Sequence, residues 1–408
     1  MSGPRTIAII GAGQAGGWAA KTLRDEGFAG HIALLGDEAH PPYERPPLSK
    51  AALLGAWPVE KCYLWPAESW REWDVDLRLR CHALRILRDR RLVEVEDGEP
   101  VAYDRLLIAT GTRPRPLTAP GAELDGVLYL RYIPDMLAIR AHMDAGGRAL
   151  VVGGGWIGLE VAAALRTLGH AVTVVEAADR LCGRAVTPAI SDWLLALHRA
   201  RGVDVRLGCS LNRFEGAQRL ERAVLDDGST IDVSLAVIGI GIVPNVEIAA
   251  EAGLAVDNGI VVDELCRTSD PDIFAAGDVT NHPSPLLGRR LRLESWENAQ
   301  NQAIAAAKSM LDRGSPYAEV PWFWSDQYDA NLQIAGIPLD WDAEVTRGDP
   351  AAGPFITFYL KGGRMEGAVA VDQGRELRFA RRLIRMGRDV SPAALADPAV
   401  KLQALLKG

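Results

Sequence analysis

One glycine pattern occurs twice in the chain, and it constrains the fold more than any other feature. The first copy is GAGQAG at residues 11–16, and the second, GGGWIG at 153–158, begins 142 residues later. Each copy lies between a short β-branched segment and an alanine-rich segment, the pattern of a strand, a tight turn and a helix. Such a turn lets the backbone approach a pyrophosphate at the helix N-terminus. The two copies therefore predict two dinucleotide-binding units.

A carboxylate follows each glycine pattern at the distance expected for a group that bonds ribose hydroxyls. Asp37 lies 26 residues after Gly11, and Glu176 lies 23 residues after Gly153. A carboxylate in the second unit repels a 2′-phosphate, so we expect NADH to be preferred over NADPH. Arg180 lies nearby, together with Arg184, and the two could bind pyrophosphate or, in another loop arrangement, a 2′-phosphate.

Composition and cysteine content argue against several classes of protein. The net charge of −8 does not favour nucleic acid or an anionic membrane as a partner. The five cysteines are odd in number and include no CxxC pair, which argues against a disulfide framework and a local zinc site. No run of 18 apolar residues occurs, and the N-terminal glycines fit a nucleotide turn better than a signal peptide. We expect a cytoplasmic protein without a metal site.

Two dinucleotide sites in one chain suggest an enzyme that holds one cofactor and exchanges the other, as flavoproteins reduced by a nicotinamide do. A strand ending in Ala109-Thr110-Gly111 leads toward the second unit, and a later one ends in Gly277-Asp278. The first nucleotide-binding domain is therefore expected to be split, with the second inserted.

Several stretches resemble the FAD- and NADH-dependent ferredoxin reductases of oxygenase systems, such as the reductase components of biphenyl and phenylpropionate dioxygenases and putidaredoxin reductase. The most specific are PPYERPPLSK at 41–50 and PWFWSDQ at 321–327. The resemblance covers essentially the whole chain. It implies an α/β fold with two Rossmann-like dinucleotide-binding domains of the glutathione-reductase type and an α+β C-terminal interface domain. The implied boundaries are 1–111 and 240–320 for the FAD-binding domain, 112–239 for the NAD-binding domain and 321–408 for the interface domain.

The resemblance also implies which residues bind the cofactors. Asp37 would hold the adenosine ribose of FAD, and Asp278 would bond its ribityl chain. The other residues implied for FAD are Gly11, Gly13, Ala15, Gly16, Arg45, Lys50, Ala83, Ala109, Thr110, Gly111, Arg131, Gly277 and Trp296. Those implied for NAD are Gly153, Gly155, Ile157, Gly158, Glu160, Glu176, Arg184 and Gly241. Arg45 and Arg131 could neutralise the pyrophosphate or form structural ion pairs.

Three residues are predicted to be catalytic. Lys50 resembles the lysine beside flavin N5, and Glu160 would keep it charged despite burial. Trp324 resembles the tryptophan near the flavin on the side that faces the partner. Trp322 is expected to be structural, and Asp326 is a weaker candidate for ordering this wall of the site.

A helix start and a missing thiol complete the predicted mechanism. Ser295 is expected to cap a helix whose first residue is Trp296, and the start of this helix directs N–H groups toward the flavin.

The segment 41–50 has no cysteine, whereas related disulfide reductases carry one or two there. The flavin must then deliver electrons directly, one at a time, which suits an iron–sulfur partner.

A basic C-terminal segment is the candidate docking surface for an acidic ferredoxin, with a solvated helix face as the alternative. Five arginines there follow helical spacing, and the arginines of a second segment could add to the surface. The candidates are Arg378, Arg381, Arg382, Arg385 and Arg388, with Arg289, Arg290 and Arg292.

The predicted partner is a 2Fe–2S ferredoxin of the Rieske type, which supplies an aromatic-ring-hydroxylating dioxygenase. Three alternatives remain: a plant-type ferredoxin that feeds a cytochrome P450, an NADH oxidase, and an NADH-binding redox-sensing flavoprotein. The sequence does not name the aromatic substrate, because this component would not touch it.

Overall fold

Three chain segments build each of two structural units. The computed structural model describes residues 4–144 and 146–407. The first unit comprises Met1–Glu44, Val59–Arg113 and Val243–Glu319, and the second comprises Arg45–Pro58, Pro114–Ile242 and Val320–Gly408. The strands β8 (Thr112–Pro114) and β17 (Ile242–Pro244) span the points where the chain passes from one unit to the other. The division into three domains with the boundaries given above stays a prediction.

A parallel five-stranded sheet forms the centre of the first unit, with the order β19-β7-β1-β2-β3. Its strands are β1 (Thr6–Ile10), β2 (His31–Leu35), β3 (Val75–Arg78), β7 (Arg105–Ile108) and β19 (Ile273–Ala275). Ile7 and Ile9 enter one buried cluster, and Ala8 and Ile10 enter another. This alternation buries both faces of the sheet, as a central parallel strand requires.

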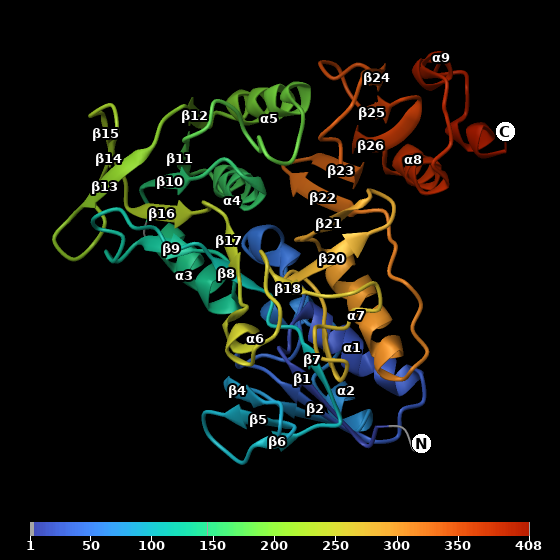
Figure 1. Cartoon of the computed structure of the whole chain (residues 1–408). Helices are drawn as coiled ribbons and strands as arrows, with labels where there is room; N and C mark the ends of the chain where they lie inside the picture. Colours follow the sequence, from blue (N-terminus) through green and yellow to red (C-terminus); the bar gives the residue numbers. More distant parts are fainter. Residues whose placement is uncertain (1–3, 145, 408) are drawn as a thin grey trace. The chain divides into compact units, whose positions relative to one another are not determined.

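Helices cover one face of this sheet, and a small antiparallel sheet covers the other. The helices α1 (Gln14–Asp25) and α7 (Trp296–Met310) pack against each other, and α2 (Ser69–Glu72) lies in the same cluster (Figure 1). The second face carries β4 (Ala83–Leu87), β5 (Leu92–Val95), β6 (Val101–Ala102) and α6 (Glu247–Glu251). A further sheet consists of β18 (Ile260–Val261), β20 (Thr280–Ser284) and β21 (Arg289–Leu291).

The second unit repeats the strand–turn–helix arrangement in a sheet of order β12-β11-β10-β16-β9. These parallel strands are β9 (Val127–Tyr129), β10 (Arg148–Val152), β11 (Ala171–Glu176), β12 (Asp204–Leu207) and β16 (Leu235–Ile238). The helices are α3 (Ile133–Asp144), α4 (Trp156–Thr167) and α5 (Pro188–Ala200). An antiparallel sheet of β13 (Leu211–Glu215), β14 (Arg222–Leu225) and β15 (Thr230–Asp232) packs in the same core.

An antiparallel five-stranded sheet near the C-terminus also belongs to the second unit (Figure 1). Its order is β22-β23-β26-β25-β24, with β22 (Trp322–Gln327), β23 (Ala330–Gly336), β24 (Ala343–Gly348), β25 (Phe355–Lys361) and β26 (Arg364–Val371). The helix α8 (Gly374–Met386) buries Leu377, Ala380, Leu383 and Ile384 in this core. After α8 come the short helix α9 (Pro392–Ala396) and the 3₁₀ turn Leu402–Leu406.

Two predictions about helix ends have opposite outcomes. The helix α7 begins at Trp296, and the Ser295 side chain accepts a hydrogen bond from the Asn298 N–H, which confirms the predicted cap. The helix α8 ends at Met386, because Gly387 takes the left-handed conformation with φ +59°. The prediction that Arg388 continues the helical stripe is therefore wrong.

Within the described ranges 4–144 and 146–407, no helix is long and apolar enough to cross a membrane.

Candidate active site

The first glycine turn connects β1 to α1, and the protein itself requires two of its glycines. Gly11 has φ +108°, and a Cβ there would lie 2.3 Å from the Ala109 carbonyl oxygen. A Cβ on Gly16 would lie 1.9 Å from the Gly11 carbonyl oxygen. By contrast, a Cβ on Gly13 would meet no protein atom within 4 Å. The protein therefore leaves open space at the glycine whose backbone a pyrophosphate approaches in such motifs.

The side chain beside this open space has polar atoms without protein partners. Both the amide nitrogen and the amide oxygen of Gln14 are buried without a hydrogen-bond partner. Leaving such groups unpaired costs about 1–3 kcal/mol. A polar ligand at the N-terminus of α1 would relieve this cost, so the residues of the turn fit a bound dinucleotide.

Other residues predicted for FAD lie around the first unit's sheet. Gly277 has φ +87°, and a Cβ there would lie 3.1 Å from the Ala15 Cβ, so these two predicted residues are neighbours. The Thr110 hydroxyl donates to the Asn245 carbonyl at 2.7 Å, which fixes the end of β7. The Asp37 carboxylate is mostly exposed and lies 3.0 Å from His82 Nδ1.

Further members of this set lie in the same unit. Ala83 begins β4, Asp278 is half-buried directly after Gly277, and Ala109 and Gly111 flank Thr110. Burial raises the pKa of Glu44, and the neighbouring Trp296 side chain lowers it in part. Sequence reasoning did not identify Glu44 or His82.

The second glycine turn has nearly the same geometry as the first. Gly153 also has φ +108°, and a Cβ on Gly158 would lie 2.1 Å from the Gly153 carbonyl oxygen. The nearest atom to a Cβ on Gly155 lies 4.0 Å away. Ile157, at the start of α4, is 44% exposed although it is apolar. The turn therefore leaves both backbone and an apolar side chain accessible to a nucleotide.

The Glu176 carboxylate orders this second turn. One oxygen accepts from the Gly154 N–H at 2.6 Å, and the other accepts from the Ala178 N–H at 2.8 Å. Each carboxylate oxygen has a second lone pair, so these bonds leave capacity for ribose hydroxyls. Glu176 thus joins the glycine turn to the end of β11, a role that the spacing alone did not indicate.

The two arginines near Glu176 have different surroundings. Arg184 Nη2 lies 3.6 Å from the position of a Cβ on Gly241, so two residues predicted for NAD lie together. The Arg180 guanidinium instead donates to the carbonyls of Gly183 and Val186. Because Arg180 closes its own loop, Arg184 is the better candidate for nucleotide phosphate.

Lys50 follows a short 3₁₀ helix, Pro46–Ser49, in the second unit. Two prolines begin this helix, where their fixed φ angles suit a helical start and their missing N–H groups cost no hydrogen bond. The N–H groups of Leu48 and Lys50 donate to the carbonyls of Arg45 and Pro47. The proline pair therefore presets the backbone that carries Lys50.

Lys50 and Glu160 form an ion pair, as predicted from the resemblance. Lys50 Nζ lies 2.8 Å from Glu160 Oε1, with side chains 16% and 3% exposed. The Ser325 hydroxyl donates to the same carboxylate oxygen at 2.6 Å, and the Ser49 hydroxyl donates to the other at 2.5 Å. Three donors thus compensate for the desolvation of the buried carboxylate. Sequence reasoning missed both serines, although each is adjacent to a predicted residue.

Trp324 lies over this ion pair. Its ring centroid is 5.7 Å from Lys50 Nζ, a distance typical of a cation–π contact. Its indole N–H donates to Asp326 at 3.0 Å, and its ring stacks on Trp322 with centroids 5.1 Å apart. Asp326 therefore orders Trp324, in agreement with its predicted supporting role.

Arg45 and Arg131 also lie together in the second unit. Arg45 Nη1 donates to the Arg131 carbonyl at 2.7 Å, and the Arg45 guanidinium lies 5.0 Å from the Tyr132 ring centroid. The Asp135 carboxylate accepts from the backbone N–H groups of Arg131 and Tyr132. Neighbours within this unit therefore order the Arg45 guanidinium and the Arg131 backbone.

The cysteines lie in environments that disfavour the thiolate. Burial raises the pKa of the thiols of Cys62, Cys182 and Cys266. Burial is also the main cause that raises the pKa of Cys81 and Cys209. All five are free cysteines. Thiol-based electron transfer therefore has no activated nucleophile among these residues.

The arginines predicted for docking fall into two groups. Of those on α8, Arg378, Arg382 and Arg385 are exposed, whereas Arg381 is half-buried and donates to the Val320 carbonyl at 3.0 Å. Arg375, which was not among the predicted residues, is also exposed on this helix. The prediction that places Arg381 on the same open stripe therefore needs correction, because its guanidinium contacts the backbone.

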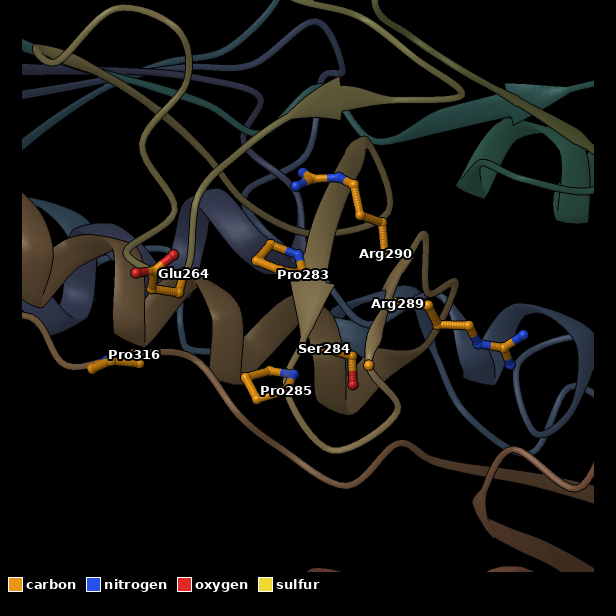
Figure 2. A pocket seen from close by; sticks show the side chains of 8 residues that line it. Glu264, Pro283, Ser284, Pro285, Arg289, Arg290 and Pro316 are labelled. Atoms are coloured by element: carbon orange, nitrogen blue, oxygen red, sulfur yellow. The ribbon is translucent and has the colours of Figure 1, made fainter.

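The second group consists of Arg289, Arg290 and Arg292, and the first two of these line a pocket of about 410 Å³ (Figure 2). Arg290 donates to the Val262 carbonyl at 2.6 Å and to Asn281, whereas the side chain of Arg289 points away from Arg290. Arg292 forms an ion pair with Glu294. Of these arginines, Arg289 is therefore the best candidate for contacting a partner.

Comparisons with known proteins agree with this geometry. Residues 5–303 match the family model for pyridine nucleotide-disulphide oxidoreductases, and residues 322–406 match a model described as the C-terminal domain of reductases. The ferredoxin–NAD(+) reductase component of the anthranilate 1,2-dioxygenase system of Burkholderia cepacia is 43% identical, over 98% of this chain and 99% of that protein. Rhodocoxin reductase of Rhodococcus erythropolis is 42% identical, over 96% of this chain and 92% of that protein.

A solved structure extends the similarity to three dimensions. The reductase in a covalent putidaredoxin reductase–putidaredoxin complex superposes with a TM-score of 0.96 and 37% identity, covering 100% of this chain and 99% of that chain. The chain belongs to the pyridine nucleotide-disulphide oxidoreductase family. Within it, the chain is an FAD-dependent oxidoreductase that uses NAD(H) and has a reductase C-terminal domain.

Proposed function

We propose that this chain passes electrons from NADH through FAD to a Rieske-type 2Fe–2S ferredoxin that supplies an aromatic-ring-hydroxylating dioxygenase. The observation that carries the proposal is the buried Lys50–Glu160 pair beneath Trp324, in a region where segment 41–50 offers no thiol. The names of similar proteins, which include reductase components of anthranilate and p-cumate dioxygenase systems, support this class of partner.

The residues of the chain have separable roles in this proposal. When bound, FAD would supply the chemistry of accepting a hydride and releasing electrons singly. The Lys50 ammonium would place a positive charge beside the bound cofactor, and Glu160 orients that ammonium. Trp324 covers the pair and excludes water from it. Gly13, Gln14 and the N-terminus of α1 bind the FAD pyrophosphate, while the turn ordered by Glu176 binds NADH.

The exposed face of α8 is the proposed docking surface. Arg375, Arg378, Arg382 and Arg385 recur at spacings of three and four, so they share one helix face. Ferredoxins are generally acidic, and complementary charge across an interface accelerates association. In the first unit, Arg289 is a separate candidate contact.

The experiment that tests the proposal is NADH-dependent reduction of cytochrome c by the FAD-loaded protein. A Rieske-type ferredoxin is added in one reaction, and a plant-type ferredoxin in the other. The proposal predicts strong stimulation by the Rieske-type protein alone. Stimulation by the plant-type protein alone would instead identify a cytochrome P450 system. If neither stimulates while NADH still reduces the flavin, the chain is an oxidase or a redox sensor.

A further inference from the structure

A chain of buried hydrogen bonds extends from the Lys50–Glu160 pair to α5. Ser325, which donates to Glu160, lies 3.0 Å from the Gln327 amide nitrogen. The Gln327 amide oxygen lies 2.7 Å from His198 Nε2, and His198 Nδ1 lies 3.2 Å from the Tyr328 hydroxyl. Ser325, Gln327 and His198 are 0%, 3% and 0% exposed. All these residues belong to the second unit.

The ionised carboxylate sets the direction of every hydrogen bond in this chain. Glu160 can only accept, so the single proton of the Ser325 hydroxyl must point toward it. Ser325 must then accept from the Gln327 amide N–H, which leaves the Gln327 carbonyl to accept from His198 Nε2–H. His198 Nδ1 consequently accepts from the Tyr328 hydroxyl. Aligned donors of this kind strengthen one another.

The surroundings of the outer members favour this arrangement. Burial lowers the pKa of His198, which keeps its imidazole neutral with one donor and one acceptor nitrogen. Burial raises the pKa of Tyr328 to about 12, so its hydroxyl keeps the proton that it donates. Tyr328 also has φ +57°, in a turn between β22 and β23, and the Arg201 guanidinium lies 5.0 Å from its ring centroid. These contacts hold an uncommon backbone conformation in place.

We infer that Ser325, Gln327 and His198 are positioning residues for the Lys50–Glu160 pair. Gln327 and His198 fix the direction in which the Ser325 hydroxyl points. Ser325 in turn fixes the orientation of the Glu160 carboxylate toward Lys50. This inference rests on the proposed role of Lys50 in flavin reduction, but its structural part concerns only residues of this chain.

The test measures how readily Lys50 reacts. Gln327→Leu removes both amide hydrogen bonds, keeps a similar volume and does not contact Glu160. The holoenzyme is treated with a water-soluble N-hydroxysuccinimide ester of acetate, and acetylation of Lys50 is followed by mass spectrometry relative to the exposed Lys361. The net contribution of one buried hydrogen bond corresponds to about a fivefold change in an equilibrium constant. We therefore expect Lys50 to be acetylated about fivefold faster in the variant. The matched control is Thr187→Val, which removes the buried Thr187–Tyr359 hydrogen bond of 2.9 Å elsewhere in the unit.

Equal Lys50 reactivity in the wild type and Gln327→Leu would overturn the inference, as would an equal increase in Thr187→Val. Should Gln327→Leu fail to fold, Ser325→Ala and Ser325→Thr serve instead. The threonine hydroxyl should preserve slow acetylation, and alanine should not; identical behaviour of the two would overturn the inference.

A kinetic readout separates this inference from the proposed function. With anaerobic rapid mixing, Gln327→Leu should lower the limiting rate of flavin reduction without changing the half-saturating NADH concentration. If Lys50→Met leaves that rate unchanged, the proposed role of Lys50 fails, whereas the acetylation result still decides whether the chain positions the pair.

Discussion

The Lys50 ammonium lies 2.8 Å from a Glu160 carboxylate that is only 3% exposed, and two serine hydroxyls complete the carboxylate's hydrogen bonds. Burial of either charge alone would cost several kcal/mol. Because the two compensate each other, the protein can hold a cation and an anion together in a partly dry location. This charge is the feature on which the proposed flavin chemistry depends.

Replacing Lys50 with methionine tests the role of this charge. Methionine keeps much of the side-chain length but removes the cation, so we expect FAD to remain bound while flavin reduction by NADH slows by about tenfold or more. Stopped-flow absorbance of the flavin measures this rate. Lys361→Met, at an exposed site, is the control. A wild-type rate in Lys50→Met would contradict the assigned role.

Glu176 is expected to control the choice of nicotinamide cofactor. Glu176→Gln retains one oxygen acceptor for the turn but removes the negative charge that repels a 2′-phosphate. The ratio of kcat/KM for NADH to that for NADPH should therefore fall, by roughly tenfold for a loss of about 1.4 kcal/mol of discrimination. Steady-state kinetics with both cofactors measures the ratio. An unchanged ratio would mean that Glu176 only orders the turn.

Charge reversal on α8 tests the docking surface. The double variant Arg378→Glu and Arg382→Glu should raise the KM for ferredoxin, and the increase should shrink at high salt because screening weakens the repulsion. Ferricyanide reduction should stay unchanged. Arg219→Glu, at a side chain 83% exposed in another part of the same unit, is the control. Equal effects on both acceptors would point to damage within the enzyme rather than lost docking.

The acid stability of the protein should depend on His282. Burial, with a smaller contribution from Arg290, lowers the pKa of His282 to about 4. The unfolded chain binds this proton near pH 6.5, whereas the folded chain does not, so stability falls as pH falls from 6.5 toward 4. The full loss amounts to roughly 3 kcal/mol. His282→Phe removes the titrating group, and urea unfolding at both pH values should show a smaller acid loss in this variant. An acid loss equal to that of the wild type would assign the effect to other groups.

Removing the cap of α7 should destabilise the fold. Ser295→Ala leaves the Asn298 N–H without its side-chain acceptor, at a cost of about 1 kcal/mol. Urea unfolding measures the difference, and Ser295→Asp, which keeps an acceptor, should recover most of it. If alanine and aspartate unfolded at the same urea concentration, the cap would contribute little.

The sequence allowed the glycine turns to be predicted because local chemistry determines them. Gly16 is required by the carbonyl of Gly11 in the same turn, and Gly11 by the carbonyl of Ala109, just after the neighbouring strand β7. The α7 cap was predictable for the same reason. The Lys50–Glu160 pair, by contrast, could be predicted only through resemblance, since nothing local links two residues so far apart.

Several functional neighbours depended on tertiary packing and could not be predicted. The Glu160 carboxylate accepts hydrogen bonds from Ser49, which is 111 residues away in the sequence, and from Ser325, which is 165 residues away. Arg381 fits the helical spacing of its stripe, yet its guanidinium reaches the Val320 carbonyl. Spacing identifies which residues share a helix face, but it does not show which of them form hydrogen bonds with other parts of the unit.

The central claim is that electrons from NADH leave the flavin one at a time for a ferredoxin. The direct measurement mixes NADH-reduced protein, under anaerobic conditions, with an excess of oxidised Rieske-type ferredoxin and follows both absorbance spectra. The account predicts rapid flavin oxidation with two ferredoxins reduced per flavin, and slower oxidation in the Arg378→Glu and Arg382→Glu double variant. A flavin that stays reduced with ferredoxin and is oxidised only when oxygen is admitted would contradict it.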